Sequence, residues 1–360
     1  PGPLPLILPA VASMPIFYSG VWLLPDNAGW LGVLAIWLLA LRPRFDAFTL
    51  LAGAAILAAL VFVRQIHLWA AAMLLAAAWL GDRDGRDGEF DFALDMRALL
   101  GAPAARVARA GAALAAALPA LAVIAWFWRS WGGLTPPVFH ERHVGGNPAA
   151  PAFVLAVFGV LSLFFVPFIL EGLRRLWVRH TWLLALALVA GAVLALAPAT
   201  TYDVSAGRYS GLWNVARRLP APLDRSILIT PLAVLGAGLA GAWFVSLTRR
   251  DRWIMLAALV AFIAAQCASF QLWQRYTEPF VLIWLAIAAA RVRPASTAAG
   301  EGWRLAGPLA LTTLLAAVTV ASLALARPVR PRDLVAPWET EPPVLPGMEP
   351  RESMDSNPLP

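Results

Sequence analysis

Uniformly apolar runs separated by short polar pieces fill most of the chain. The runs are about 14 to 22 residues long, close to the length that an α-helix needs to cross the hydrocarbon core of a bilayer. Strands of a membrane barrel would instead alternate apolar with polar positions. The pattern therefore predicts an all-α, polytopic transmembrane helical bundle with about ten to eleven spans. The predicted spans cover residues 4–24, 28–41, 46–63, 66–80, 111–128, 151–170, 181–197, 226–247, 253–270, 276–290 and 305–326.

Composition supports the bilayer as the surrounding solvent. Hydrophobic residues make up 60% of the 360 residues and charged residues only 14%, and the core of a water-soluble domain needs far less apolar surface. All 28 basic residues are Arg, and they form no dense stripe with interleaved aromatics, so we expect no nucleic-acid partner. The single cysteine, Cys267, lies within an apolar run and indicates neither a disulfide framework nor a thiolate metal site.

Arginine in short loops predicts which loops share a side of the membrane, because such residues stay on the cytoplasmic side. One orientation places the Arg-containing loops together on that side, where we expect Arg to anchor them: 42–44, 81–110, 171–180, 248–252 and 291–304. The external side then carries the segments 25–27, 64–67, 129–149, 198–225 and 271–275. These external segments hold most of the polar groups that are available for chemistry.

The chain divides into a membrane part and a tail. We expect residues 1–326 to form the transmembrane helical domain and residues 327–360, which are rich in Pro and acids, to form a disordered external tail. The chain begins Pro-Gly-Pro without an initiator Met or a signal peptide, so we expect it to lack an N-terminal part of a longer protein. The absence of Lys favours a GC-rich bacterial source, and we predict a multi-pass protein of the bacterial inner (plasma) membrane.

Arg64, Gln65 and His67 interrupt two apolar runs at the external boundary. Ionisable groups at membrane depth are costly and need a partner or a function. Arg64 could bind a phosphate bidentately, while Gln65 and His67 could hydrogen-bond hydroxyl groups. The alternative is a structural role, in which the Arg64 side chain reaches back to the interface.

A second external cluster lies within residues 201–218. It combines Asp203, Arg208, Tyr209, Trp213, Arg217 and Arg218. The three Arg residues suit a lipid phosphate or pyrophosphate, and the aromatic rings offer faces for sugars. The alternative is an aromatic belt with Arg at the lipid headgroups.

Two smaller features lie at predicted span ends. Arg275 and Tyr276 open one span. Arg275 and Glu278 lie at helical spacing, and the alternative to a ligand role is that they only neutralise each other's charge. Asp26 follows Pro25 and is a candidate external carboxylate base, although an N-cap for the next helix explains it equally well.

We expect no metal and no cofactor. His140 and His143 lie three residues apart in an external loop, but the four ligands of a zinc site are absent from the pattern. The acids within residues 81–97 lack the spacing of a calcium loop, and interleaved Arg would oppose a cation.

Five of these stretches make the chain similar to the C-type membrane glycosyltransferases, which use lipid-phosphate-sugar donors, and within them to the dolichyl-phosphate-glucose α-1,2-glucosyltransferase family. The stretches are Pro15 to Asp26, Val63 to Trp69, Val144 to Asn147, Arg208 to Arg218, and Arg275 to Pro279. The family has Arg-Gln-Thr-Asn where this chain has Arg64-Gln65-Ile66-His67. It also has an acid and an amide before the position of Arg208, which this chain lacks. The resemblance covers most of residues 10–290.

The resemblance implies a hexosyltransferase that moves a sugar from a polyprenyl-phosphate-sugar donor to a lipid-linked or cell-surface glycan acceptor on the external face. The implied donor-phosphate contacts are Arg64, Arg208, Arg217, Arg218 and Arg275. The implied sugar contacts are Gln65, His67, Asn147, Tyr209, Trp213 and Tyr276. The family places its catalytic carboxylate in the first external loop, and no such acidic loop precedes Asp26. The resemblance therefore implies that the main carboxylate lies upstream of the chain or that the chain is a catalytically altered relative. Asp26 and Asp203, a stand-in for the acid that the family has before Arg208, are the weaker candidates within the chain.

Two rival functions fit a polytopic protein. A transporter or lipid flippase would place polar residues along a path through the middle of the membrane, whereas the candidates here gather at one face. A non-catalytic membrane scaffold that contacts only membrane lipids would leave the external clusters without ligands.

Overall fold

A computed structural model describes residues 4–21, 25–83, 90–101, 103–137, 145–292 and 301–325. These residues contain helices and no strand; a single isolated backbone bridge joins Asp203 and Arg208. The predicted all-α class is therefore confirmed. Residues Pro1–Thr319 make up one unit, and a second unit begins at Val320.

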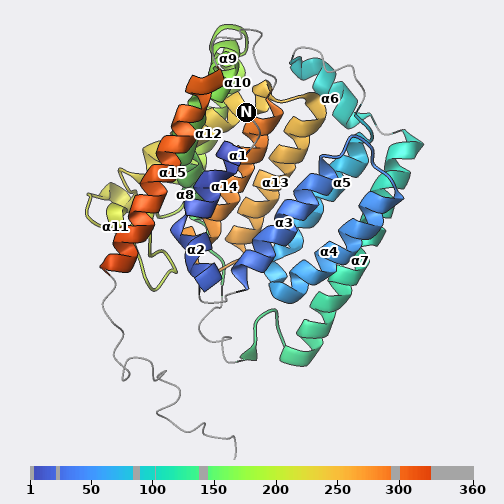
Figure 1. The fold of residues 1–360 in the computed structure, drawn as a ribbon, viewed down its shortest axis with the longest axis horizontal. Coiled ribbons are helices and arrows are strands. Elements are labelled where there is room, and N and C mark those ends of the chain that lie inside the picture. The colour runs from blue at the N-terminus through green and yellow to red at the C-terminus, as the bar shows by residue number, and fades with distance from the viewer. Residues whose placement is uncertain are drawn as a thin grey trace, which may run out of the picture. The chain divides into compact units, whose positions relative to one another are not determined.

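The helices follow one another along the chain (Figure 1), and most connections are short; longer ones follow α7 and α10. Their bounds are α1 Leu4–Ala12, α2 Met14–Val21, α3 Asp26–Ala40, α4 Ala47–Val63, η1 Gln65–Ala70, α5 Ala71–Leu80, α6 Phe92–Leu100, α7 Ala104–Trp131, α8 Ala150–Ser162, η3 Leu163–Phe165, α9 Val166–Arg179, α10 Thr181–Leu196, α11 Leu212–Ala216, η4 Pro222–Asp224, α12 Ile229–Ser246, α13 Arg249–Cys267, α14 Gln274–Arg291 and α15 Glu301–Ala324.

The loops that were predicted to be cytoplasmic contact one another at one end of the helices. Arg250 donates to the carbonyl oxygens of Ala40 and Gly81, each at 2.8 Å. Arg291 donates to the carbonyl oxygen of Leu41 at 2.9 Å. We call this the predicted cytoplasmic end.

The segments that were predicted to be external meet at the other end, which we call the predicted external end. The Asn147 amide donates to the carbonyl oxygens of Ala206 at 2.8 Å and of Phe270 at 3.1 Å, and so joins three segments that are far apart in the sequence. The backbone N–H of Leu212 donates to the Gln274 side chain at 2.6 Å. The Arg pattern thus grouped the loops correctly by end.

Four charged side chains at the predicted cytoplasmic end are buried, and we did not expect this. Asp95 of α6 accepts from Arg252 of α13 at 2.5 Å, and both side chains are 3% exposed. Arg249 binds the other oxygen of the same carboxylate at 2.7 Å. Arg250 and Asp251 are buried beside them. The Arg residues of this loop are therefore part of a buried network that holds α6 against α13, rather than simple anchors at the interface.

Aromatic rings fill the middle of the bundle. Phe262 of α13 and Phe280 of α14 stack with ring centroids 3.8 Å apart. Trp37 of α3 also stacks on Phe280 at 5.6 Å, and Trp69 approaches both Phe rings edge-on at 5.4 Å. This core links the α3–α5 part of the chain to α13 and α14.

Helices α8 and α12 cross at two glycines. A Cβ on Gly236 would overlap the carbonyl oxygen of Leu155, and a Cβ on Gly159 would lie 2.7 Å from the carbonyl oxygen of Leu232. Small residues at such a crossing let two backbones approach closely, which is a common basis of helix association in membranes.

We expect Gly236→Ala to destabilise the protein by about 1–3 kcal/mol, because the added methyl group forces α8 and α12 apart. Thermal unfolding in detergent measures the effect. Gly241→Ala on the same helix is the matched control, since its Cβ would make ordinary contacts of 3.5 and 3.6 Å. Equal unfolding temperatures for the two variants would contradict the close crossing.

Four of the described helices are long and apolar enough to cross a bilayer, or five if the bent pair α1 and α2 makes one span. The four are 104–131, 150–179, 222–246 and 303–324. The predicted ten to eleven spans are therefore not confirmed. Several apolar helices are short: α3 has 15 residues, which rise about 22 Å against a hydrocarbon core of about 30 Å.

Candidate functional site

Asp26 and Arg64 form an ion pair at the predicted external end. Arg64 ends α4 in an extended conformation (φ −158°, ψ 125°), and its Nη1 lies 2.5 Å from the carboxylate of Asp26. Asp26 opens α3 but does not cap it, because Pro25 occupies the N-cap position and no side chain caps the helix. A carboxylate in the first turn also interacts favourably with the helix dipole.

Two guanidinium groups converge on the phenol oxygen of Tyr276. Arg64 Nη2 donates to it at 3.0 Å, and Arg275 Nη2 donates to the same oxygen. Both cations also lie over the Tyr276 ring, with the central carbons 4.6 Å and 4.7 Å from its centroid. Tyr276 therefore holds the positive charges of Arg64 and Arg275 close together, although Arg64 is 212 residues from Tyr276 in the sequence.

Trp273 completes this group, and our sequence analysis did not select it. Arg275 lies 4.1 Å from its ring centroid, and Tyr276 stacks parallel to it at 5.8 Å with an interplanar angle of 9°. Tyr209 meets Trp273 edge-on at 5.3 Å. The signal that could have found it is the spacing of Trp273 and Tyr276, three residues apart at a helix start. We call Asp26, Arg64, Trp273, Arg275 and Tyr276 the Asp26 cluster.

The Asp26 cluster carries an excess of positive charge. Two guanidinium cations against one carboxylate leave a formal charge of one positive unit. Among the described residues Arg275 has no ion-pair partner, and its Nε has no hydrogen-bond partner. The alternative role considered for Arg275, a pair with Glu278, is not seen among the described residues, and buried Glu278 instead accepts from the Gln274 amide at 2.6 Å. Such an arrangement can bind an anion.

Asp203 and Arg208 are occupied within their own loop. The Asp203 carboxylate accepts from Ser205 at 2.6 Å and from the N–H of Ala206 at 3.2 Å, and it lies 3.4 Å from Arg208. The hydrogen bond from the Ser205 hydroxyl is the main reason that the pKa of Asp203 is lowered. Arg208 is buried, which lowers its pKa, and it donates to the carbonyl oxygen of Thr201. These contacts stabilise the loop.

Asn147 and Trp213 are also buried, with exposed fractions of 1% and 0%. Asn147 donates to two backbone carbonyl groups, as described above. Trp213 donates to the carbonyl oxygen of Leu272 at 3.1 Å and stacks on Phe153 at 4.8 Å. Their polar atoms and ring faces are used inside the protein, so the predicted sugar contacts for these two residues have no exposed surface to act on.

The remaining candidates differ in exposure. His67 is buried and packs so closely on α3 that a Cβ on Gly29 would lie 2.5 Å from its Nε2. Gln65 is partly exposed in η1. Arg217 and Arg218 are exposed, and Arg217 lies 5.0 Å from the ring centroid of Tyr202. Of the predicted site residues, Arg64, Arg275 and Tyr276 belong to the Asp26 cluster, and Tyr209 contacts it through Trp273.

No group of three His, Cys, Asp or Glu side chains that could hold a metal ion occurs within the part of the chain that the structure describes. His140 and His143, the pair considered as possible zinc ligands, lie outside the described residues.

No family model, curated protein or solved structure matches the chain.

Proposed function

We propose that the chain is a multi-pass membrane glycosyltransferase that uses a polyprenyl-phosphate-sugar donor, with the donor phosphate bound at the Asp26 cluster. The observation that carries the proposal is the convergence of Arg64 and Arg275 on Tyr276 beside a single carboxylate. Guanidinium groups bind phosphate oxygens through paired N–H donors and keep their charge at all physiological pH values.

The charge of the cluster fits this class of ligand. A polyprenyl-phosphate-sugar is a phosphodiester with one negative charge, and the cluster has one positive charge in excess. Ionisable groups at the edge of an apolar helix bundle are costly unless they bind a partner. An anion that arrives within the plane of the membrane supplies that partner and keeps its lipid chain in the bilayer.

Aromatic rings beside the cations offer a surface for the sugar. Trp273 lies against Arg275, and Tyr209 meets Trp273 edge-on. Aromatic rings with a polar edge suit ligands that have both apolar and polar parts. Two of the stretches that carry the resemblance to C-type glycosyltransferases, Arg64-Gln65 and Arg275-Tyr276, meet at this position. Their meeting supports the proposal.

In the proposed reaction Asp26 accepts the proton of an acceptor hydroxyl as its oxygen attacks the anomeric carbon of the donor sugar. The bond from that carbon to the phosphate oxygen breaks, and the lipid phosphate leaves with the bonding electrons. Arg64 and Arg275 stabilise the charge that develops on the leaving phosphate. Direct displacement inverts the configuration and needs no covalent intermediate. The finer count of about ten to eleven spans, an external active face and a bacterial inner membrane belong to the same proposal.

A transporter or lipid flippase is the second candidate. It is favoured by buried polar groups close to the predicted external end, namely Glu278, Gln266 and Thr277. Phosphate binding without sugar transfer, together with movement of lipid between leaflets, would support it over the enzyme.

Binding of a short-chain polyprenyl phosphate to the purified protein in detergent tests the proposal. We expect Arg275→Gln to weaken binding about tenfold or more, because hydrogen bonds to charged groups contribute about 1.5–3 kcal/mol. Arg218→Gln is the control, since Arg218 is an exposed Arg of the same end and lies outside the Asp26 cluster. Equal affinities for the two variants would overturn the assignment of the phosphate site.

A further inference from the structure

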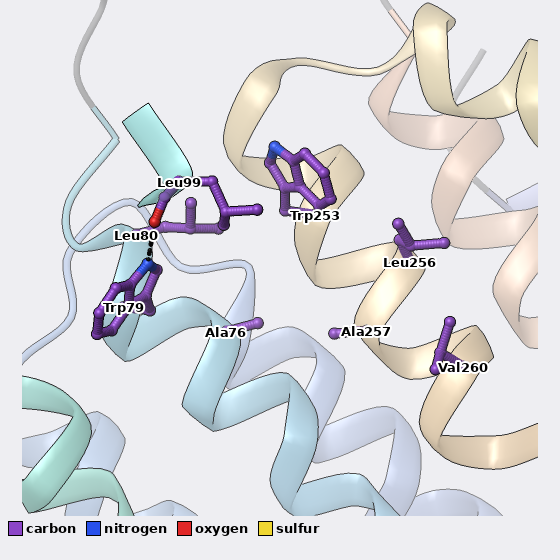
Figure 2. Close-up of a pocket in the computed structure, with 8 residues that line it drawn as sticks. All are labelled: Ala76, Trp79, Leu80, Leu99, Trp253, Leu256, Ala257 and Val260. Carbon is purple, nitrogen blue, oxygen red and sulfur yellow. Dashed lines mark hydrogen bonds between the residues drawn. The ribbon is translucent and has the colours of Figure 1, made fainter. Parts of the chain in front are cut away.

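An apolar groove lies between α5, α6 and α13, towards the predicted cytoplasmic end and away from the Asp26 cluster (Figure 2). It encloses about 280 Å³. Its walls include Ala76, Trp79, Leu99, Trp253, Ala257 and Val260. Val260 at the edge is 56% exposed, so the groove opens towards the surroundings of the bundle.

Short side chains create the groove and bulky ones frame it. Ala76 of α5 and Ala257 of α13 point towards each other across the gap, as Figure 2 shows, and neither reaches the opposite wall. Trp79 donates its indole N–H to the carbonyl oxygen of Leu99 at 2.8 Å, which fixes α6 across the end of α5. The gap is thus part of the fold rather than a loosely packed region.

A cation lies one helical turn beyond the groove on the same face of α13. Arg249 precedes Trp253 by four residues, and residues four apart share a helix face. Arg249 binds Asp95 through its Nε alone, its terminal amino groups have no partner among the described residues, and its side chain is 34% exposed. These groups can donate to a phosphate at the mouth of the groove.

We propose that the groove holds one acyl chain of an anionic membrane glycerophospholipid whose phosphate contacts Arg249. The stripe from Arg249 to Val260 spans eleven residues, a rise of about 16 Å along the helix, which is close to half of a hydrocarbon core of about 30 Å. The distance therefore matches one leaflet, with the headgroup at Arg249 and the chain between Ala76 and Ala257. The site is separate from the proposed glycosyltransferase site and does not depend on it.

Native mass spectrometry of the full chain in detergent, titrated with phosphatidylglycerol or phosphatidylcholine of the same acyl chains, tests this site. We expect one phosphatidylglycerol to bind more tightly than phosphatidylcholine. Ala257→Trp fills the groove and should weaken that binding about tenfold or more. Arg249→Gln should weaken phosphatidylglycerol about fivefold and phosphatidylcholine less, because the choline cation already offsets the charge of the phosphate in phosphatidylcholine.

Ala264→Trp is the matched control, because Ala264 lies on the same side of α13, is exposed and does not line the groove. If Ala257→Trp fails to fold, Val260→Trp at the exposed edge provides the same obstruction. Equal affinity for the two lipids in the unmodified chain would overturn the proposal and indicate only a general lipid shell. Retained phosphatidylglycerol binding in a folded Ala257→Trp or Val260→Trp variant would also overturn it.

Discussion

An Asp26→Asn variant is expected to transfer sugar about 10²- to 10⁴-fold more slowly, the usual contribution of a positioned general base. The same variant should bind polyprenyl phosphate about tenfold more tightly, because the carboxylate that neutralises Arg64 is gone and one guanidinium nitrogen becomes free for the ligand. A lower kcat with a lower Kd is an unusual combination. If Asp26 merely supported the local structure, its replacement would lower both the transfer rate and the affinity for polyprenyl phosphate.

The measurement is transfer of labelled glucose from polyprenyl-phosphate-glucose, the donor that the resemblance implies, in membranes that contain the protein. Asp203→Asn is the control, since Asp203 is the other candidate carboxylate and is occupied by Ser205, Ala206 and Arg208. We expect this control to keep its transfer rate. Full activity in Asp26→Asn would exclude Asp26 as the base, whether or not the phosphate site is correct.

An Asp95→Asn variant is expected to lose about 3–5 kcal/mol of stability, because removing one partner of a buried ion pair leaves a buried charge without compensation. Here one carboxylate serves both Arg249 and Arg252, at 2.7 and 2.5 Å. The loss should appear as a lower unfolding temperature in detergent.

Glu171→Gln is the control for the Asp95 variant. Glu171 pairs with Arg175 at 3.0 Å, but its side chain is 54% exposed, and exposed pairs contribute only about 0–1 kcal/mol. If Asp95→Asn unfolded at the same temperature as Glu171→Gln, the buried network would not be what holds α6 against α13.

The sequence was sufficient to predict most of the helices and to group several loops by end. It did not predict α6, which lies within the predicted loop 81–110, or the bend that divides the predicted span 4–24 into α1 and α2. Apolar runs fix the helices because the backbone must satisfy its own hydrogen bonds there. The Arg-containing loops then sort by end, and contacts such as those of Arg250 with Ala40 and Gly81 agree with that sorting. The number of spans was harder to predict, because an apolar run such as that of α3 does not reveal whether it crosses a bilayer or is a short helix packed against others.

Individual contacts in the site were less predictable. Asp95 and Arg252 are 157 residues apart, and nothing in either local sequence indicates that the two side chains meet. Trp213 appeared to be an exposed ring in a polar segment, but it packs on Phe153 of another helix. Arg64 and Tyr276 were both selected, yet their contact depends on how α4 ends and α14 begins, which short-range patterns do not define.

In the proposed multi-pass arrangement, the short helices beside the Asp26 cluster would affect the surrounding bilayer. Helices α3 and α4, with 15 and 17 residues, rise about 22 and 26 Å, which is less than an ordinary hydrocarbon thickness of about 30 Å. Lipids that meet such elements relieve the hydrophobic mismatch by local thinning. Headgroups around α3 and α4 would then sit lower than elsewhere, and a polyprenyl phosphate diffusing in that leaflet would be brought to the depth of Arg64 before it makes any contact with the protein.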